Sequence, residues 1–227
     1  MSINQYRETS LHLALKRYFA DADATLEAEL RGYIVDILRG ESVIEIQTGN
    51  FGAMKRKLSA LLPDHPMTIV YPIAVERWLI GLDLQERVIS ERKSPKRGNI
   101  YQLFNELVYL PPETLTHPNF SLIGVMVRDQ ELRIADGKGS WRRKHMSIYD
   151  RRLVQVVETH HFKTLTDFSA LLPVDLPTPF TTADLASALA QPKRLAQKIA
   201  FTLKQMEIIA ITGKRGNAYC YSPCLNG

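Results

Sequence analysis

Hydrophobic residues in the first half of the chain recur with two different periods. Leu11, Leu15 and an aromatic residue at 18 or 19 fall at helical spacing, which predicts a helix. Between residues 25 and 31, apolar and charged residues alternate, as is typical of a half-buried strand. Runs rich in β-branched residues predict further strands. The elements predicted for this half are helices at 10–20, 53–62 and 100–110, and strands at 25–31, 33–38, 43–47, 67–74, 77–80 and 120–127. Strands 67–74 and 120–127 are near-continuous apolar runs, as in buried strands after a crossover helix.

The second half is predicted to be mostly helical. Leu153, Val156 and Val157 form a stripe that predicts a helix at 149–160. A proline-rich segment at 175–179 marks a linker or turn. Thr181 or Thr182 is expected to cap a helix that runs to 189, and Pro192 to begin a helix that runs to about 206. A helix at 165–172 and strands at 207–212 and 218–221 complete the pattern.

This order predicts an α/β (α+β) protein with a mixed sheet flanked by helices and a smaller C-terminal unit. The predicted domains are 1–135, a helical connector at 136–179, and 180–227, with a start near 163 as the alternative for the last.

Two carboxylates interrupt the apolar runs at 33–38 and 43–47. If Leu38 pairs with Val43 across the turn, Asp36 lies directly opposite Glu45 on the same face. Side chains so placed are roughly 5 Å apart at Cβ, and like charges there destabilise a sheet. A divalent cation is one compensating partner, because hard cations take carboxylate oxygens. The alternative is that Asp36 pairs with an arginine and Glu45 faces solvent.

Residues near the hairpin extend this hypothesis. Glu27 and Glu29 share one face of the strand at 25–31, and either is a candidate third carboxylate. His12 and Lys16 share one face of the first helix, either beside the carboxylates or in solvent.

The order of helix, three strands and helix, with Asp36 on one strand and Glu45-Ile-Gln47-Thr48 on the next, resembles the PD-(D/E)xK nuclease superfamily, particularly its RecB-like branch. The resemblance covers roughly the first 130 residues and implies a restriction-endonuclease-like fold. It implies that Asp36, Glu45 and Glu27 bind Mg²⁺ (or Mn²⁺), and it prefers Glu27 over Glu29. Gln47 stands where the family usually has lysine and cannot supply the positive charge that a lysine gives to a transition state. A lysine of the next helix, which carries Lys55 and Lys57, could replace the missing lysine, and Lys55 is the candidate; phosphate contact or solvation is the alternative.

The C-terminal order of helix, turn, helix and basic-tipped hairpin resembles a winged helix, whose second helix would be the recognition helix. We expect phosphate contacts from basic residues of the loop at 91–97, of this helix and of the hairpin tip. These residues are Arg92, Lys93, Lys96, Arg97, Lys193, Arg194, Lys198, Lys214 and Arg215. Solvation alone, or a protein contact, is the alternative for each group. Trp141-Arg-Arg-Lys144 is a further basic patch with an aromatic residue.

The distribution of charge along the chain indicates what kind of partner the protein binds. The 227 residues carry a net charge of +5, and the excess lies in the C-terminal part: residues 140–227 carry +6 and residues 1–139 carry −1. This asymmetry suggests a polyanionic partner. No apolar run is long enough to cross a membrane, the polar N-terminus does not resemble a secretory signal, and Cys220 and Cys224 are expected to be ordinary residues of a reducing compartment, which predicts a cytoplasmic protein.

Three hypotheses follow for function. The first is a metal-dependent nuclease that hydrolyses DNA phosphodiester bonds. The second is a catalytically inactive, nuclease-fold DNA-binding or regulatory protein that uses its winged helix. The third is an interaction module whose winged helix is a homodimer surface. The sequence contains no Walker pattern and no Gly-x-Gly-x-x-Gly loop, so it offers no nucleotide-binding motif.

Overall fold

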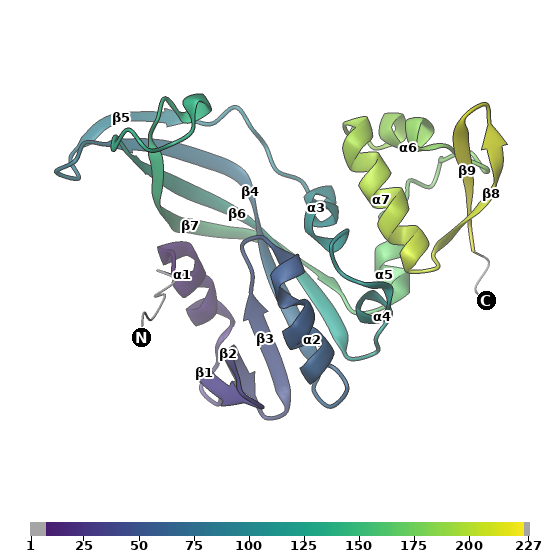
Figure 1. The fold of residues 1–227 in the computed structure, drawn as a ribbon, viewed down its shortest axis with the longest axis horizontal. Helices are drawn as coiled ribbons and strands as arrows, with labels where there is room; N and C mark the ends of the chain where they lie inside the picture. Colours follow the sequence, from purple (N-terminus) through teal and green to yellow (C-terminus); the bar gives the residue numbers. More distant parts are fainter. Residues whose placement is uncertain (1–7, 225–227) are drawn as a thin grey trace.

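A mixed sheet of seven strands, flanked by helices, forms the larger part of the molecule (Figure 1). The computed structural model describes residues 8–224. The predicted absence of a secretory signal concerns residues that lie mostly outside this range. The elements of the larger part are α1 (Ser10–Phe19), β1 (Thr25–Leu30), β2 (Tyr33–Arg39), β3 (Ser42–Ile46), η1 (Phe51–Met54), α2 (Lys55–Leu61), β4 (Met67–Leu82), β5 (Val88–Lys93), η2 (Ile100–Leu103), α3 (Phe104–Leu107), α4 (Pro112–Leu115), β6 (Phe120–Ile134), η3 (Trp141–Arg143) and β7 (Ser147–Phe162).

The sheet begins with an antiparallel meander and continues with parallel strands. Its order is β1-β2-β3-β4-β6-β7, with β5 paired to β4. β3 runs parallel to β4, and β4 runs parallel to β6, so α2 is a crossover connection. The predicted hairpin register is confirmed, because Leu38 pairs with Val43 and Ile37 with Ile44.

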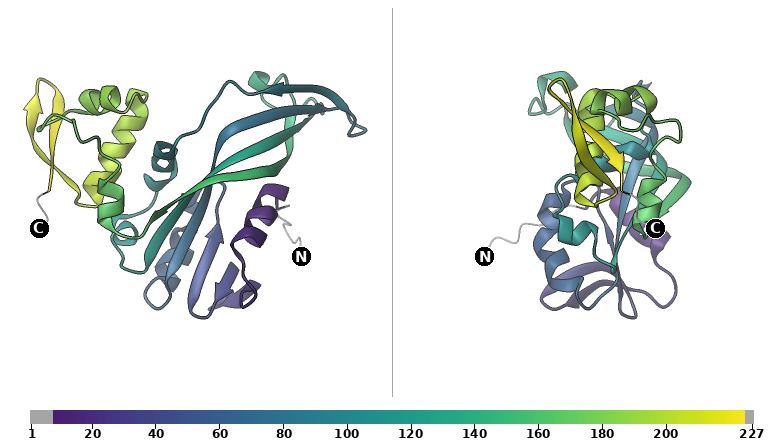
Figure 2. Two further views of the ribbon diagram at one scale, coloured as in Figure 1. Left: turned by 180° about the vertical axis from the view of Figure 1, so that it is seen from behind. Right: turned by 90° about the vertical axis from the view of Figure 1, so that its right-hand side faces the viewer.

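The two faces of the sheet carry separate hydrophobic clusters. Leu11 and Leu15 of α1 pack with Ile44 and Ile46 of β3 on one face. The other cluster contains the apolar sides of α2 and α3 and is continuous with the C-terminal core. The helices therefore fix the hairpin from both sides (Figure 2).

The helix predicted at 149–160 is wrong, because this segment lies in β7. β7 pairs antiparallel with β6, and three register shifts interrupt the pairing. Leu153 and Val156 have partners on β6, whereas Val154 and Val157 are passed over at the shifts and are exposed. Each bulge inserts one residue and breaks the period of two. Leu153 and Val156 thus pack against the same cluster although they are three positions apart, which imitates a helical stripe.

The long strands differ from the prediction in two more respects. The strands predicted at 67–74 and 77–80 are one strand, β4, with a register shift near Val75. Part of the predicted loop at 91–97 belongs to β5. The far halves of β4, β6 and β7, together with β5, form an arm that extends away from the hairpin (Figure 1).

The C-terminal unit packs on the larger part through a common core. It comprises α5 (Leu165–Ser169), α6 (Thr182–Ala188), α7 (Lys193–Gln205), β8 (Ile209–Arg215) and β9 (Ala218–Pro223). The helix predicted to begin at Pro192 is present as α7, and its core face, with Ile199 and Leu203, is buried. The predicted cap is also confirmed, because Thr181 forms a capping box with Asp184. Among the described residues, no helix is long and apolar enough to span a membrane.

Candidate functional site

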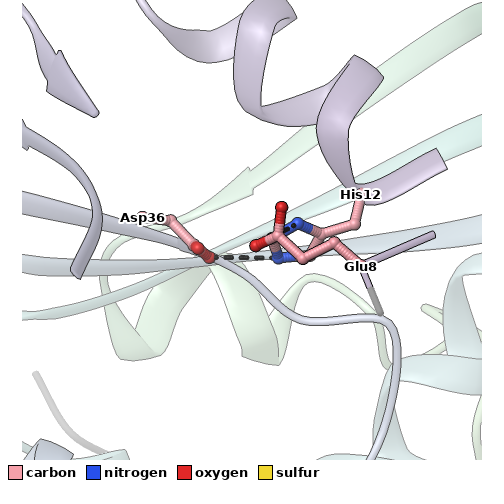
Figure 3. A group of neighbouring side chains, drawn as sticks. All are labelled: Glu8, His12 and Asp36. Atoms are coloured by element: carbon pink, nitrogen blue, oxygen red, sulfur yellow. Dashed lines mark ion pairs between the residues drawn. The ribbon is translucent and has the colours of Figure 1, made fainter. Parts of the chain in front are cut away.

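Asp36 lies beneath α1, close to His12 of this helix and to Glu8 just before it (Figure 3). Its Oδ2 is 3.3 Å from Nε2 of His12, and its Oδ1 is 3.2 Å from Nζ of Lys16. His12 and Lys16 are one helical turn apart, so α1 presents both to the same carboxylate. The hypothesis that places these two residues beside the carboxylates is therefore confirmed for Asp36.

Lys16 is the buried centre of this cluster. Its side chain is only 3% exposed, and its Nζ lies 2.9 Å from Glu8, 3.2 Å from Glu27 and 3.2 Å from Asp36. Three carboxylates thus surround one ammonium group, so the cluster has an excess of negative charge even with Lys16 in place.

Glu45 is joined to Asp36 through the backbone and binds a different cation. The Asp36 amide donates to Oε1 of Glu45 at 3.3 Å, and the Ile46 amide donates to Oδ2 of Asp36 at 2.8 Å. Nζ of Lys57, on α2, lies 2.5 Å from Oε1 of Glu45 and 2.6 Å from the carbonyl of Ile34.

The prediction that Asp36 and Glu45 share one face is wrong. The pairing of β2 with β3 ends at Ile37 and Ile44, one step before the two carboxylates. Asp36 meets α1 and Glu45 meets α2, and these helices cover opposite faces of the sheet. The repulsion that motivated a bridging metal is relieved by one set of cations on each side.

The other predicted catalytic residues are only partly brought together. Glu27 reaches the cluster through Lys16, but its side chain is 63% exposed. The side-chain amide of Gln47 donates to the carbonyl of Asn50 at 3.4 Å, away from both carboxylates. Lys55 is exposed, whereas Lys57 contacts Glu45. Of the two lysines, Lys57 is therefore the one that reaches the carboxylates, because the rotation of the helix places position 57 toward the sheet.

The two central carboxyl groups are shifted in opposite directions. Burial would raise the pKa of Asp36, but the hydrogen bond and charge of His12, the Ile46 amide and Lys16 hold that pKa below its ordinary value. Burial raises the pKa of Glu45, and the charge of Asp36 adds to the rise although Lys57 opposes it. Burial would lower the pKa of His12, but Asp36 and Glu8 raise it. Such opposed shifts are frequent at functional sites.

Glu8, His12 and Asp36 form the set that is best arranged for a metal ion. One potential ligand atom from each lies within 4.8 Å of the others (Figure 3). Nδ1 of His12 is buried, makes no hydrogen bond among the described residues, and lies 3.4 Å from Glu8. The sequence could have suggested Glu8 only by its helical spacing from His12, and polar residues at this spacing are common on solvated faces.

A second polar region lies on the arm of the sheet. A cleft of about 910 Å³ extends from Thr48, at the end of β3, to the loop that carries Trp141. Arg92 and Lys96 of the predicted basic loop line it. Lys93 and Arg97 are held elsewhere, since Lys93 pairs with Glu76 and Arg97 donates to the carbonyl of Ser94.

Within the described part of the chain, two of the five basic residues predicted on the C-terminal unit form hydrogen bonds with side chains of other elements. Lys193 and Arg194 are exposed on α7, and Lys214 and Arg215 lie near the tip of the β8–β9 hairpin. Arg215 also pairs with Asp184 at 3.1 Å. Nζ of Lys198 instead contacts Oδ1 of Asn105 in α3 at 3.0 Å, on the side that packs against the larger part of the molecule.

Comparison with known proteins assigns the chain to a family. The model of a family described as a domain of unknown function, DUF8091, matches residues 9–163. The chain belongs to this family. The DUF8091 region spans α1 to β7, which includes the whole seven-stranded sheet. An uncharacterized protein of Treponema pallidum (strain Nichols) is 35% identical over 187 residues, which cover 82% of this chain and 74% of the relative. No solved structure matches the chain.

Proposed function

We propose that this protein is a metal-dependent nuclease that acts on DNA through the Asp36–Glu45 hairpin. The observation that carries the proposal is Lys57, which reaches Glu45 from α2 and supplies the ammonium group that Gln47 lacks. The order α1-β1-β2-β3-α2-β4, with β3 parallel to β4, supports the resemblance to the PD-(D/E)xK superfamily.

His12, Asp36 and Glu8 would hold the metal in this proposal. Nδ1 of His12, which makes no hydrogen bond among the described residues, and the neighbouring carboxylates fit such a role. One imidazole among carboxylates suits a transition metal such as Mn²⁺ better than Mg²⁺, which takes oxygen ligands. A bound metal supplies polarisation of the phosphodiester and lowers the pKa of an attacking water. Lys57 lies with Glu45 on the other face of the sheet from this metal set, so its charge would act through Glu45, whose Oε1 accepts from the Asp36 amide.

A catalytically inactive DNA-binding protein is the second candidate, and Lys16 favours it. This ammonium group already neutralises Asp36 at 3.2 Å and is almost fully buried. In this alternative the cluster ties α1 to the hairpin, and the exposed basic face of α7 and the β8–β9 hairpin contacts DNA.

The decisive experiment measures cleavage of linear and supercoiled DNA with Mn²⁺ or Mg²⁺. We expect Mn²⁺-dependent cleavage that Asp36→Asn, Glu45→Gln and Lys57→Met each reduce by about 100-fold or more. Lys55→Met makes the same change on the same helix at an exposed position, and we expect it to retain cleavage. Salt-sensitive DNA binding without cleavage under either metal would favour the inactive protein.

A further inference from the structure

The inner wall of the cleft on the arm is built from three arginines and two buried carboxylates. Arg77 of β4 binds Asp129 of β6 through Nε at 2.7 Å and through Nη2 at 2.5 Å, and its Nη1 donates to Glu131 at 3.0 Å. Glu131 also binds Arg133 at 2.7 Å and Arg151 of β7 at 3.4 Å. Three adjacent strands thus hold three guanidinium groups in one place.

Exposure shows which partner faces the cleft. The side chains of Asp129 and Glu131 are 1% and 4% exposed, whereas those of Arg77, Arg133 and Arg151 are 23%, 19% and 28% exposed. The arginines form the surface, Glu131 lines the cleft beneath them, and Asp129 binds Arg77 without lining the cleft. Two negative charges do not neutralise three positive ones, so the inner wall keeps a net positive charge.

Stability alone does not explain this arrangement. Taking charges out of water costs several kcal/mol per ion, and apolar replacements of buried ion pairs are often neutral or stabilising. At binding sites, the side chains that contact a ligand are often held in one rotamer by residues behind them. The two buried carboxylates hold the arginines in this way. Each guanidinium has five N–H donors, so Arg151, which contacts Glu131 through Nη2, retains donors for a ligand.

One rim of the cleft is tied to the sheet, and the other is closed by a hydrogen bond within its own loop. The Gly98 amide donates to the carbonyl of Ala74 at 2.8 Å, and a Cβ at Gly98 would lie 2.6 Å from that oxygen. On the opposite rim, the Gly139 amide donates to the carbonyl of His145 at 2.9 Å. The loop after Gly139 presents Trp141, which is 74% exposed, beside the cationic side chains of Arg142 and Arg143.

We propose that this cleft is a phosphate-binding pocket that takes a nucleotide unit, with its phosphate groups on Arg77, Arg133 and Arg151 and its base on Trp141. Guanidinium forks match phosphate oxygens in pairs, and an exposed indole ring offers a stacking surface to any base. Arg142 and Arg143 on the rim add charge for a second phosphate. The nucleotide is either free or the terminal unit of a nucleic-acid strand.

The pocket goes beyond the proposed nuclease and does not depend on it. Its contacts need no metal, and neither Asp36 nor Glu45 lines the cleft. We therefore expect Asp36→Asn, in the presence of EDTA, to bind nucleotides as the unaltered protein does. If the protein does not cleave DNA, nucleotide binding in EDTA is still expected.

Titration calorimetry in EDTA at low salt tests the pocket with ADP, pyrophosphate, adenosine, and a short oligonucleotide with a 5′-phosphate or a 5′-hydroxyl. The chain has two tryptophans, and in Trp78→Phe the remaining one, Trp141, reports stacking by fluorescence quenching. We expect binding of phosphorylated probes but not of adenosine. Arg142→Ala/Arg143→Ala is expected to weaken that binding by about tenfold or more, and Arg151→Gln to weaken it as well.

The matched control is Arg56→Ala/Lys163→Ala, which removes two positive charges from exposed positions outside the cleft. If ADP and the 5′-phosphorylated oligonucleotide bind equally well, the ligand of the pocket is a free nucleotide. If only that oligonucleotide binds, the ligand is the end of a nucleic-acid strand. Three results would overturn the pocket: no binding of any probe, equal losses in the two double variants, or equal binding of both oligonucleotides without binding of ADP.

Discussion

Two clusters of buried charge use similar groups in opposite ways. At the hairpin, Lys16 is 3% exposed while Asp36 is 17% exposed, so the cation is the inner partner. On the arm, Asp129 is 1% exposed while Arg77 is 23% exposed, so the carboxylate is the inner partner. The outer partner determines the ligand: the hairpin presents oxygen and imidazole atoms suited to a cation, and the arm presents N–H donors suited to an anion.

The chemistry of the cations sharpens this contrast. Lysine is a compact charge on a flexible stem, so a metal ion can displace it, and histidine titrates near neutral pH, so its neutral ring can bind a metal. Arginine stays charged and binds in a fixed fork. The side chains around Asp36 at the hairpin can therefore rearrange around a ligand, whereas the arginines bound to Asp129 and Glu131 on the arm are already held in place.

The strongest test of the comparison is Arg77→Met. It leaves Asp129 buried without its cation, and we expect a loss of about 3–5 kcal/mol in the free energy of unfolding, measured by urea denaturation. Arg77→Met/Asp129→Leu removes both charges and is expected to recover most of the loss. If the single variant is as stable as the unaltered protein, the arm is not preorganised by this pair.

A smaller effect is expected for Lys16→Met at the hairpin. Glu8 and Glu27 are more exposed than Asp129 and can turn to water, so we expect a loss of about 2 kcal/mol. The same variant is expected to bind Mn²⁺ more tightly by calorimetry, because Asp36 loses a competing cation. Unchanged or weaker Mn²⁺ binding would show that Lys16 does not compete with a metal there.

The smallest expected effect is a pH dependence at Glu131. Burial would raise its pKa, but Arg133, Arg77 and Arg151 hold it below the ordinary value of 4.5. The ionised group therefore stabilises the fold above about pH 4.5, and this contribution is lost as the pH falls through the folded-state pKa. Glu131→Gln should give a shallower fall of unfolding free energy below pH 4.5. An identical acid slope in both proteins would contradict the assignment.

Local sequence signals predicted the hairpin and the C-terminal helices well. The register of Leu38 with Val43 follows from a short turn between β-branched runs, and a threonine cap at 181 or 182 follows from the start of the helical pattern, with Thr181 the one that the structure uses. The strand β7 could not be predicted in this way. Its bulges are defined only against β6, and they gave Leu153 and Val156 a helical spacing.

The residues of the candidate sites likewise fall into those that the sequence could identify and those that only the structure could. Sequence alone selected Asp36 and Glu45, since charged residues within apolar strands stand out, and it placed His12 and Lys16 on one helical face. The choice of Lys57 over Lys55 required the rotation of α2 on the sheet. The cleft on the arm required more, because Arg77, Glu131 and Arg151 come from strands far apart in the chain.

What the sequence determined by itself is therefore what neighbouring residues decide: the hairpin, the caps and the helical faces. Only the tertiary structure decided which charges meet, which of them are buried, and that the two hairpin carboxylates face different helices. The physical reason is that burial and ion pairing depend on distances across the sheet. Those distances are set by pairing and bulges between strands that are remote in sequence.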